Sequence, residues 1–235
     1  MIEPYPAGTT ELDWRDWDII NDMENQGICG SCYAFSTIAA AESAYAIATG
    51  ELYKLSEQHI VSCDSSNYGC EGGLQWWASE FLKNEGTILA SDYPYANENV
   101  SSTISCNSSK RSSDKVFYLQ GTKGYKVIGS SYTAFKEALL IEPINISFAV
   151  GNDFMYYSSG IYTGAGCAYQ LNHAMQAVGF GVENGVEFTW IRNQWGTSWG
   201  IDGYAKVKLI SGNYGVCDLY TDNTFTLVGY DPENL

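Results

Sequence analysis

Residues 26–35 read Gln26-Gly27-Ile28-Cys29-Gly30-Ser31-Cys32-Tyr33-Ala34-Phe35 and open an alanine-rich run that continues to Ala48. Alanine favours helix, and Gly50 follows where a helix would end, so we expect a helix over Cys32–Ala48. The run is apolar on nearly every face, which indicates a buried helix. Cys32 would then lie in the first turn, where the helix dipole stabilises a thiolate, the nucleophilic form of cysteine.

A thiolate nucleophile needs a base, and the chain contains two histidines, His59 and His173. His173 opens an apolar run. Asn193 follows between tryptophans, and its side chain could accept a hydrogen bond from an imidazole N–H while an indole shields that bond from water. We therefore select Cys32, His173 and Asn193 as candidate catalytic residues.

Composition excludes several classes of protein. The 235 residues fit one or two domains, and 45% of them are apolar, which excludes intrinsic disorder. A net charge of −15 argues against binding to nucleic acid or to anionic lipid. No apolar run reaches the roughly 18 residues of a membrane span.

Seven cysteines leave one thiol over if three disulfides form, which would indicate an oxidising compartment. The N-terminus has neither the basic nor the apolar part of a signal peptide, so we expect a mature domain without its targeting and pro-segments. Sequons occur at Asn99, Asn107 and Asn145. The first two lie in a polar loop, 97–115, whereas Asn145 lies in an apolar run and is expected in a strand.

The chain changes from a helical half to a mostly β half, which favours an α+β fold with two lobes. Further helices are expected from the N-cap Ser56, over Leu74–Asn84 and over Thr133–Leu140. The predicted strands are 122–128, 144–150, 174–182, 186–193, 203–210 and 224–229. Glu183-Asn184-Gly185 predicts a hairpin between two of them.

The motif Cys29-Gly30-Ser31-Cys32-Tyr33 fits the signature around the nucleophile of papain-like proteases, in which His and Asn follow far downstream. His173 lies 141 residues after Cys32, and Asn193 lies 161 residues after it. The chain therefore resembles the papain family of cysteine proteases over nearly its whole length, and cathepsin L more than cathepsin B. Two positions depart from the family pattern: Tyr33 stands where Trp is commoner, and Gln194 where Ser is usual.

The resemblance implies a role for each matched residue. Cys32 would be the nucleophile, His173 its base and acid, and Asn193 would orient the imidazole. The Gln26 side-chain amide would join the Cys32 N–H in an oxyanion hole, because the tetrahedral oxygen needs donors in place before charge develops. The implied disulfides are Cys29–Cys70, Cys63–Cys106 and Cys167–Cys217.

Substrate recognition is implied in the same way. Gly72 and Gly73 would bind the substrate backbone, because a larger side chain would block its approach. Asp222 would form the floor of the pocket for the side chain second before the scissile bond, where an acid can meet Lys or Arg. The alternative is that Asp222 points to solvent. The remaining substrate-binding residues would be Gly30, Leu74, Ser147, Leu171, Asn172, Ala174 and Trp195.

Other interpretations of single residues stay open. Cys29 and Cys32 could form a redox pair, although no βαβ unit precedes the helix. His59 and Cys63 are spaced for a metal pair, but we favour an exposed histidine and a disulfide, and expect no metal or cofactor. Glu42 would form a buried ion pair, with Arg192 as candidate partner. Trp199 is expected in the core, and Trp195 in the core or shielding the site.

We expect one papain-like domain over residues 1–235, with a cleft between its lobes. The helical lobe would span about 21–118. A β-barrel-like, antiparallel lobe would comprise about 1–20 and 119–235. The short segment between Gly73 and Tyr93 leaves no room for the cleft-blocking insertion of cathepsin B, which predicts an endopeptidase.

Expected partners are protein or peptide substrates, the protein's own propeptide and cystatin-like inhibitors, with no nucleic acid and no membrane. We expect a monomer in the lysosome, in a digestive vacuole or outside the cell. The alternative functions are a catalytically silent binding protein and a peptide ligase or transpeptidase.

Overall fold

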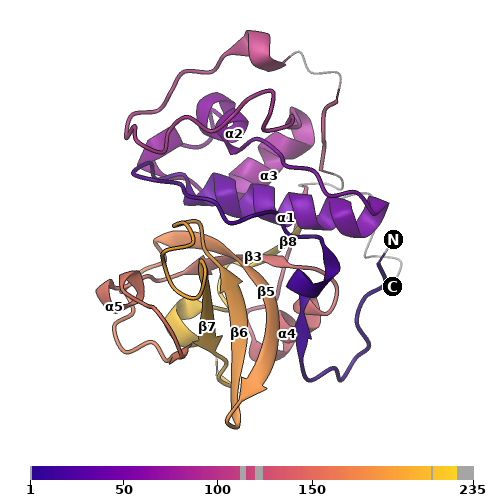
Figure 1. Ribbon diagram of the computed structural model, residues 1–235, viewed down its shortest axis with the longest axis vertical. Coiled ribbons are helices and arrows are strands. Elements are labelled where there is room, and N and C mark those ends of the chain that lie inside the picture. Colours follow the sequence, from indigo (N-terminus) through magenta and orange to yellow (C-terminus); the bar gives the residue numbers. More distant parts are fainter. Residues whose placement is uncertain (1, 112–114, 120–123, 213, 227–235) are drawn as a thin grey trace.

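The structure is a computed structural model that describes residues 2–111, 115–119, 124–212 and 214–226. Three helices lie on one side of the molecule and the sheet lies on the other (Figure 1), which confirms the α+β fold. The helices are α1 (Cys32–Thr49), α2 (Glu57–Cys63), α3 (Gln75–Asn84), α4 (Tyr132–Leu139) and α5 (Asn152–Met155). Short 3₁₀ turns occur at Trp14–Trp17, Gly69–Glu71, Ser108–Arg111 and Val216–Asp218.

The strands form one open sheet. They are β1 (Leu12–Asp13), β2 (Tyr125–Val127), β3 (Ile144–Phe148), β4 (Ile161–Tyr162), β5 (His173–Glu183), β6 (Val186–Arg192), β7 (Tyr204–Lys208) and β8 (Thr224–Thr226). Their order is β2-β8-β3-β5-β6-β7-β4, with β1 paired to β5. The path does not close into a barrel, and β4 pairs with β7 in parallel, so the expectation of a purely antiparallel arrangement is wrong at that edge.

The predicted elements are present with small shifts at their ends. The strands predicted at 144–150, 174–182, 186–193 and 203–210 differ from β3, β5, β6 and β7 by at most two residues at either end. Residues 122–123 and 227–229, at the outer ends of two other predicted strands, lie outside the described residues. Sequence periodicity did not reveal β1, β4 and α5, because elements of two to four residues are too short to show a period.

Helix α1 separates two apolar cores, which explains its nearly complete burial. Ala34 and Ile38 belong to the core among the helices, whereas Ala46 belongs to the core of the sheet. The Ser36 hydroxyl donates to the carbonyl of Met175 in β5 at 3.1 Å. The helix ends at Gly50, whose N–H donates to the Ala46 carbonyl, as predicted. Cys32 is thereby held at the edge where the helices meet the sheet.

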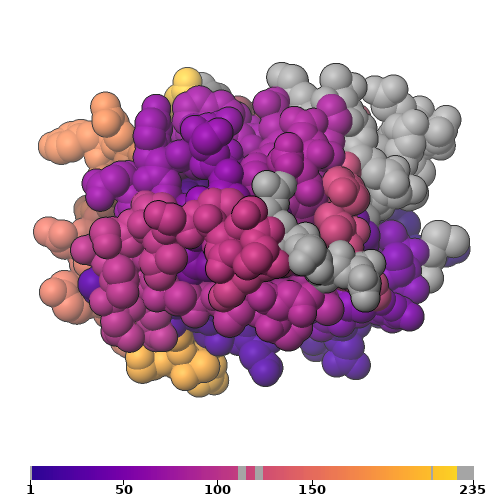
Figure 2. Space-filling view, turned by 90° about the horizontal axis from the view of Figure 1, so that it is seen from above, coloured from indigo at the N-terminus to yellow at the C-terminus, as the bar shows by residue number. Residues whose placement is uncertain are grey.

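The long polar segment that follows α3 covers the helical side (magenta in Figure 2). Asn99 and Asn107, its two sequons, are exposed, and Cys106 anchors the segment to Cys63 at the end of α2. Asn145 is fully buried in β3, as its apolar neighbours predicted. Within the part of the chain that the structure describes, no helix has the length and apolar character needed to cross a bilayer.

Glu42 forms the buried ion pair that was expected, but its partner is Lys54, whose Nζ lies 2.9 Å from the Glu42 Oε1. The expectation of Arg192 as the partner is wrong, because Arg192 lies near Glu24. The expectation of an exposed His59 is also wrong. His59 is 1% exposed rather than solvent-facing, and its Nδ1 lies 3.4 Å from the Thr87 hydroxyl. Both partners come from segments after the helix in question, so spacing within a helix did not identify them.

Candidate active site

Cys32 begins α1 and carries a free thiol, while the other six cysteines form disulfides. The bonded pairs are those that the resemblance implied: Cys29–Cys70, Cys63–Cys106 and Cys167–Cys217. Burial raises the pKa of the Cys32 thiol, and hydrogen bonds from the backbone N–H groups of Ala174, Tyr33 and Cys32 itself oppose the rise. The contact with Ala174 places the thiol beside the residue that follows His173.

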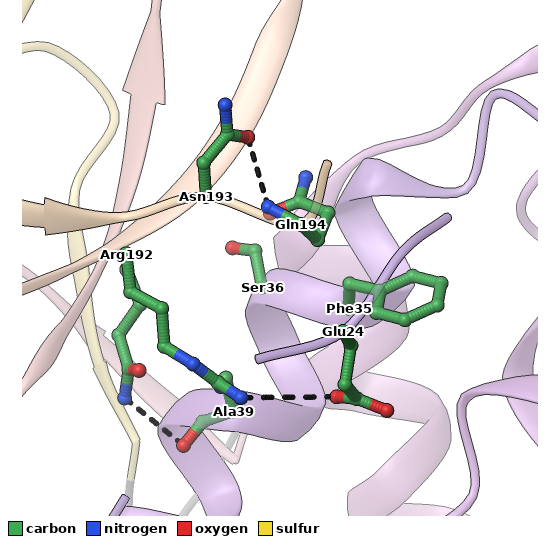
Figure 3. A pocket seen from close by; sticks show the side chains of 8 residues that line it. Glu24, Phe35, Ser36, Ala39, Arg192, Asn193 and Gln194 are labelled. Carbon is green, nitrogen blue, oxygen red and sulfur yellow. Dashed lines mark hydrogen bonds and ion pairs between the residues drawn. The ribbon is translucent and has the colours of Figure 1, made fainter. Parts of the chain in front are cut away.

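His173 and Asn193 meet because β5 and β6 pair antiparallel. His173 begins β5, and Asn193 follows the last residue of β6. The His173 Nε2–H donates to Asn193 Oδ1 at 2.9 Å. The same oxygen accepts from the Gln194 N–H (Figure 3). Burial lowers the pKa of His173 to about 4, and the Asn193 hydrogen bond opposes that shift. The imidazole is therefore held in one orientation beside the thiol-bearing turn.

An aromatic layer covers this pair. The rings of Trp195 and His173 stack with centroids 4.8 Å apart and an angle of 28° between their planes. Trp199, which is buried, meets Trp195 edge-on at 5.2 Å and donates its indole N–H to the Met155 carbonyl. Trp199 thus belongs to the core, and Trp195 lies over the imidazole with one ring face.

Gln26 lies in the segment that precedes α1. Its side-chain N–H₂ donates to the Cys29 carbonyl at 2.8 Å, and its backbone N–H donates to the Gln194 carbonyl at 2.9 Å. Only 7% of the residue is exposed. The Gln26 carboxamide is therefore held against Cys29, three residues before the first residue of α1.

The glycines of the expected cleft have structural reasons for being glycine. Gly72 has φ 112, in the region that favours glycine, and open space where a side chain would be. A Cβ on Gly73 would lie 2.1 Å from the side-chain oxygen of Asn67, which accepts from the Leu74 N–H. Gly30 donates its N–H to the Cys70 carbonyl at 2.9 Å. The fold itself thus requires glycine at 73, besides any need for substrate access.

Residues expected around the specificity pocket come from neighbouring strands. Ser147 of β3 lies directly opposite Ala174 of β5, and its N–H donates to the Asn223 side-chain oxygen at 3.3 Å. Asp222 precedes that anchor, has φ 55 and is exposed. Leu171 is half-buried, and Asn172 is exposed with its side chain bonded to both backbone groups of Val150. The Asp222 loop therefore lies beside the two strands that carry Ser147 and Ala174.

A small pocket lies behind Asn193, between α1 and the ends of β5 and β6 (Figure 3). Arg192 and Glu24 face each other across it at 4.0 Å. Gln176 donates to the Ala39 carbonyl at 3.0 Å and ties the strand to the helix. These contacts join the end of the sheet to α1 and to the segment before it.

Sequence reasoning missed Tyr95 as a member of the site. Its hydroxyl lies 2.8 Å from the Ser31 hydroxyl and donates to the Gln26 carbonyl at 2.8 Å. Tyr95 therefore joins the segment that carries Gln26 to the N-cap of α1. The surrounding sequence, a polar loop, contains no signal for this role, because only folding brings the loop to α1.

The comparisons with known proteins agree with this geometry. A protein-family model described as papain family cysteine protease matches residues 8–227. The cysteine proteinase COT44 of Brassica napus is 42% identical, over 94% of this chain and 66% of that protein. Chymopapain of Carica papaya is 37% identical, over 97% of this chain and 62% of that protein. The chain thus spans slightly less than two thirds of the length of these relatives.

Solved structures with the same fold include two plant enzymes. The Carica candamarcensis cysteine protease CMS1MS2, in complex with E-64, has a TM-score of 0.84 and 35% identity, covering 94% of this chain and all of that chain. The proform of the ragweed pollen allergen Amb a 11, a cysteine protease, has a TM-score of 0.87 and 32% identity. The match covers 97% of this chain and 68% of that chain.

Proposed function

Because the chain belongs to the papain family of cysteine proteases, we propose that it is an endopeptidase that cleaves peptide bonds through an acyl-enzyme on Cys32. The observation that carries the proposal is the free thiol of Cys32 beside the hydrogen-bonded pair of His173 and Asn193. Burial on its own disfavours both charged forms. A thiolate and an imidazolium side by side stabilise each other, so we expect the two groups to ionise as one pair.

Acylation begins when the Cys32 sulfur forms a bond to the peptide carbonyl carbon. The carbonyl π electrons move to the oxygen, which takes hydrogen bonds from the Gln26 N–H₂ and the Cys32 N–H. The oxyanion then reforms the carbonyl as the C–N bond breaks, and His173 gives its proton to the departing amine nitrogen. Asn193 holds the imidazole in the orientation that both transfers require.

Deacylation uses the same groups in reverse. Neutral His173 takes a proton from water, whose oxygen attacks the thioester carbon. The second tetrahedral oxyanion occupies the same hole. When the C–S bond breaks, the acid product leaves and the Cys32 thiolate with its imidazolium partner is restored.

Asp222 would give the enzyme its substrate preference. It would accept Arg or Lys second before the scissile bond, in a pocket walled by Leu74, Ser147, Leu171 and Ala174. Support comes from the Asn223 anchor, which holds the Asp222 loop against Ser147. Gly30, Gly72, Gly73, Asn172 and Trp195 would line the rest of the cleft, where apolar side chains remain acceptable at the same position.

The two apolar cores support a division of the domain into a helical lobe, about 21–118, and a β lobe formed by the rest. We further propose that the enzyme acts as a monomer in a lysosome, vacuole or extracellular space. Its own propeptide and cystatin-like proteins would inhibit it by occupying the cleft.

The test combines covalent labelling with a cleavage assay. The chain is incubated with the epoxide E-64, and intact-mass and peptide mapping should find one added inhibitor, on Cys32. A peptide blocked at both termini should be cut internally by the untreated protein only. Cys32→Ala should remain folded and lose both labelling and cleavage.

Each alternative function has its own outcome in this test. Labelling of Cys32 without cleavage of any peptide would indicate a silent binding protein and overturn the proposal. Joined peptides that form with an added amine in preference to hydrolysis would indicate a ligase. Cleavage retained in Cys32→Ala would place the nucleophile elsewhere.

A further inference from the structure

Gln194, which stands where the family usually has Ser, contacts the oxyanion donor directly. Its side-chain N–H₂ donates to Gln26 Oε1 at 3.1 Å and to the Ala174 carbonyl at 2.8 Å. Its own backbone carbonyl accepts from the Gln26 N–H at 2.9 Å. Gln194 is 5% exposed, so these bonds lie away from bulk water. Residue 194 therefore binds Gln26 through both backbone and side chain.

These bonds fix which end of the Gln26 carboxamide points toward Cys29 and which toward Gln194. Oε1 accepts from Gln194, and the N–H₂ group donates one hydrogen to the Cys29 carbonyl. The second N–H stays available to an oxyanion. A reversed carboxamide would set N–H₂ against the Gln194 donor and oxygen against the Cys29 oxygen. Both hydrogen bonds would become repulsive contacts, so the reversed orientation is disfavoured.

The same side chain also reaches the other wall of the site. Ala174, whose carbonyl accepts from Gln194, directs its backbone N–H to the Cys32 thiol. One buried amide thus connects the oxyanion donor with the strand that carries His173. A serine side chain is too short to span both partners in this way, so this connection is specific to glutamine at 194.

We propose that Gln194 is a positioning residue, which holds the Gln26 N–H₂ toward the developing oxyanion and acts on the rate through Gln26. The inference rests on the proposed protease function. During attack, the C–S bond forms and the carbonyl electron pair moves to the oxygen. The Gln26 N–H₂ donates to that oxygen, and Gln194 holds this donor in place.

The experiment is a double-mutant cycle on peptide hydrolysis, with Gln194→Met, Gln26→Ala and the double variant. Methionine keeps the length of the side chain and removes its donors. Gln194→Met should lower kcat by about three- to tenfold, the effect of one neutral hydrogen bond, with KM nearly unchanged. In the Gln26→Ala background the same substitution should have no further effect on kcat.

Two further measurements separate positioning from loss of packing. E-64 labelling opens an epoxide and forms no carbonyl oxyanion, so its rate should be unchanged in Gln194→Met. Gln176→Met is the matched control, since Gln176 is also buried and bonds α1 through Ala39 and Ser43. It should lower the melting temperature to a similar extent and leave kcat unchanged.

If Gln194→Met does not fold, Gln194→Glu provides a second test of the same inference. An ionised carboxylate cannot donate to Gln26, whereas a protonated carboxyl can, so kcat relative to wild type should recover as the pH falls. Equal losses of labelling and hydrolysis, or multiplying effects in the double variant, would overturn the inference while leaving the protease function intact. Absence of hydrolysis in the wild type would instead contradict the proposed function.

Discussion

The indole of Trp195 lies over the imidazole of His173, with ring centroids 4.8 Å apart and planes inclined by 28°. The indole covers one face of the imidazole, whose Nε2–H donates to Asn193 Oδ1 at 2.9 Å. Hydrogen bonds strengthen where water is excluded, so we expect the indole to stabilise the orientation of His173 on which the proposed proton transfer depends.

We predict that Trp195→Ala lowers kcat/KM by about tenfold, because water then competes for the His173–Asn193 bond. Trp195→Phe keeps a ring over the imidazole and should lose less. Melting temperatures of both variants control for loss of the contact with Trp199. Wild-type kcat/KM in Trp195→Ala would show that the indole has no shielding role.

Loss of Asn193 should differ in kind from loss of His173. His173→Ala removes the proton donor and acceptor, so hydrolysis should be undetectable. Asn193→Ala removes only the group that orients the His173 imidazole. We expect kcat to fall by roughly ten- to a hundredfold, which is the effect of losing one or two hydrogen bonds. The measurement is the single-turnover rate of peptide hydrolysis for each variant, with Cys32→Ala as the inactive reference. If Asn193→Ala were as inactive as Cys32→Ala, the assignment of a purely orienting role would be wrong.

Asp222→Ala should change selectivity rather than overall activity. Loss of a charge-assisted bond of about 1.5–3 kcal/mol would lower kcat/KM roughly ten- to a hundredfold for substrates with Arg second before the cleaved bond. Substrates with Phe there should be cut as before. Asp18→Ala is the matched control, since Asp18 is also exposed with φ 51. Equal changes on both substrates would show that Asp222 does not line the pocket.

Glu142 should make the protein less stable as the pH rises. Burial raises the pKa of Glu142 to about 8 from its ordinary value of 4.5, and its Oε1 accepts from the Thr226 N–H at 2.8 Å. Between these values the folded chain retains a proton that the unfolded chain has lost. The free energy of unfolding should therefore fall from pH 4.5 to pH 8, by at most about 4 kcal/mol.

Urea unfolding at pH 5 and pH 8 measures this effect. Glu142→Gln keeps the acceptor and should reduce the difference in unfolding free energy between the two pH values. Glu187→Gln is the control, because the bonds to Lys136 and Tyr132 lower the pKa of Glu187, and its contribution is lost only below about pH 4.5. An unchanged difference in Glu142→Gln would contradict the prediction.

Lys54 should be essential for stability, because it neutralises two buried carboxylates. Its Nζ contacts Glu42 and Glu57, whose side chains are 1% and 2% exposed. Burial alone would lower the pKa of Lys54, but the neighbouring carboxylates raise it overall, so the residue stays charged. Lys54→Met would leave both acids without their cation, at a cost of about 3–5 kcal/mol.

Urea unfolding of Lys54→Met beside Lys136→Met checks this prediction. Lys136 pairs with Glu187, whose side chain is 40% exposed, and loss of such a pair near the surface should cost less than about 1 kcal/mol. Similar losses in the two variants would show that burial adds nothing to the Lys54 pairs.

The sequence predicted features that depend on neighbouring residues. The alanine-rich run and Gly50 predicted α1, and the Asn184-Gly185 turn predicted the β5–β6 hairpin, because caps and turns are set by local backbone preferences. The motif around Cys32 predicted the family, and through it the three disulfides. Elements as short as β1 and β4 left no pattern in the sequence.

Only the tertiary structure decided which side chains meet across the molecule. Gln194 reaches Gln26 over 168 residues, Tyr95 reaches Gln26 over 69, and Glu42 meets Lys54 rather than Arg192. These contacts depend on the position and angle at which α1 packs against β5, and on the loops that cross between the two cores. Such distances follow from packing of the whole chain, so the composition and spacing that determined the helix, the hairpin and the family could not determine them.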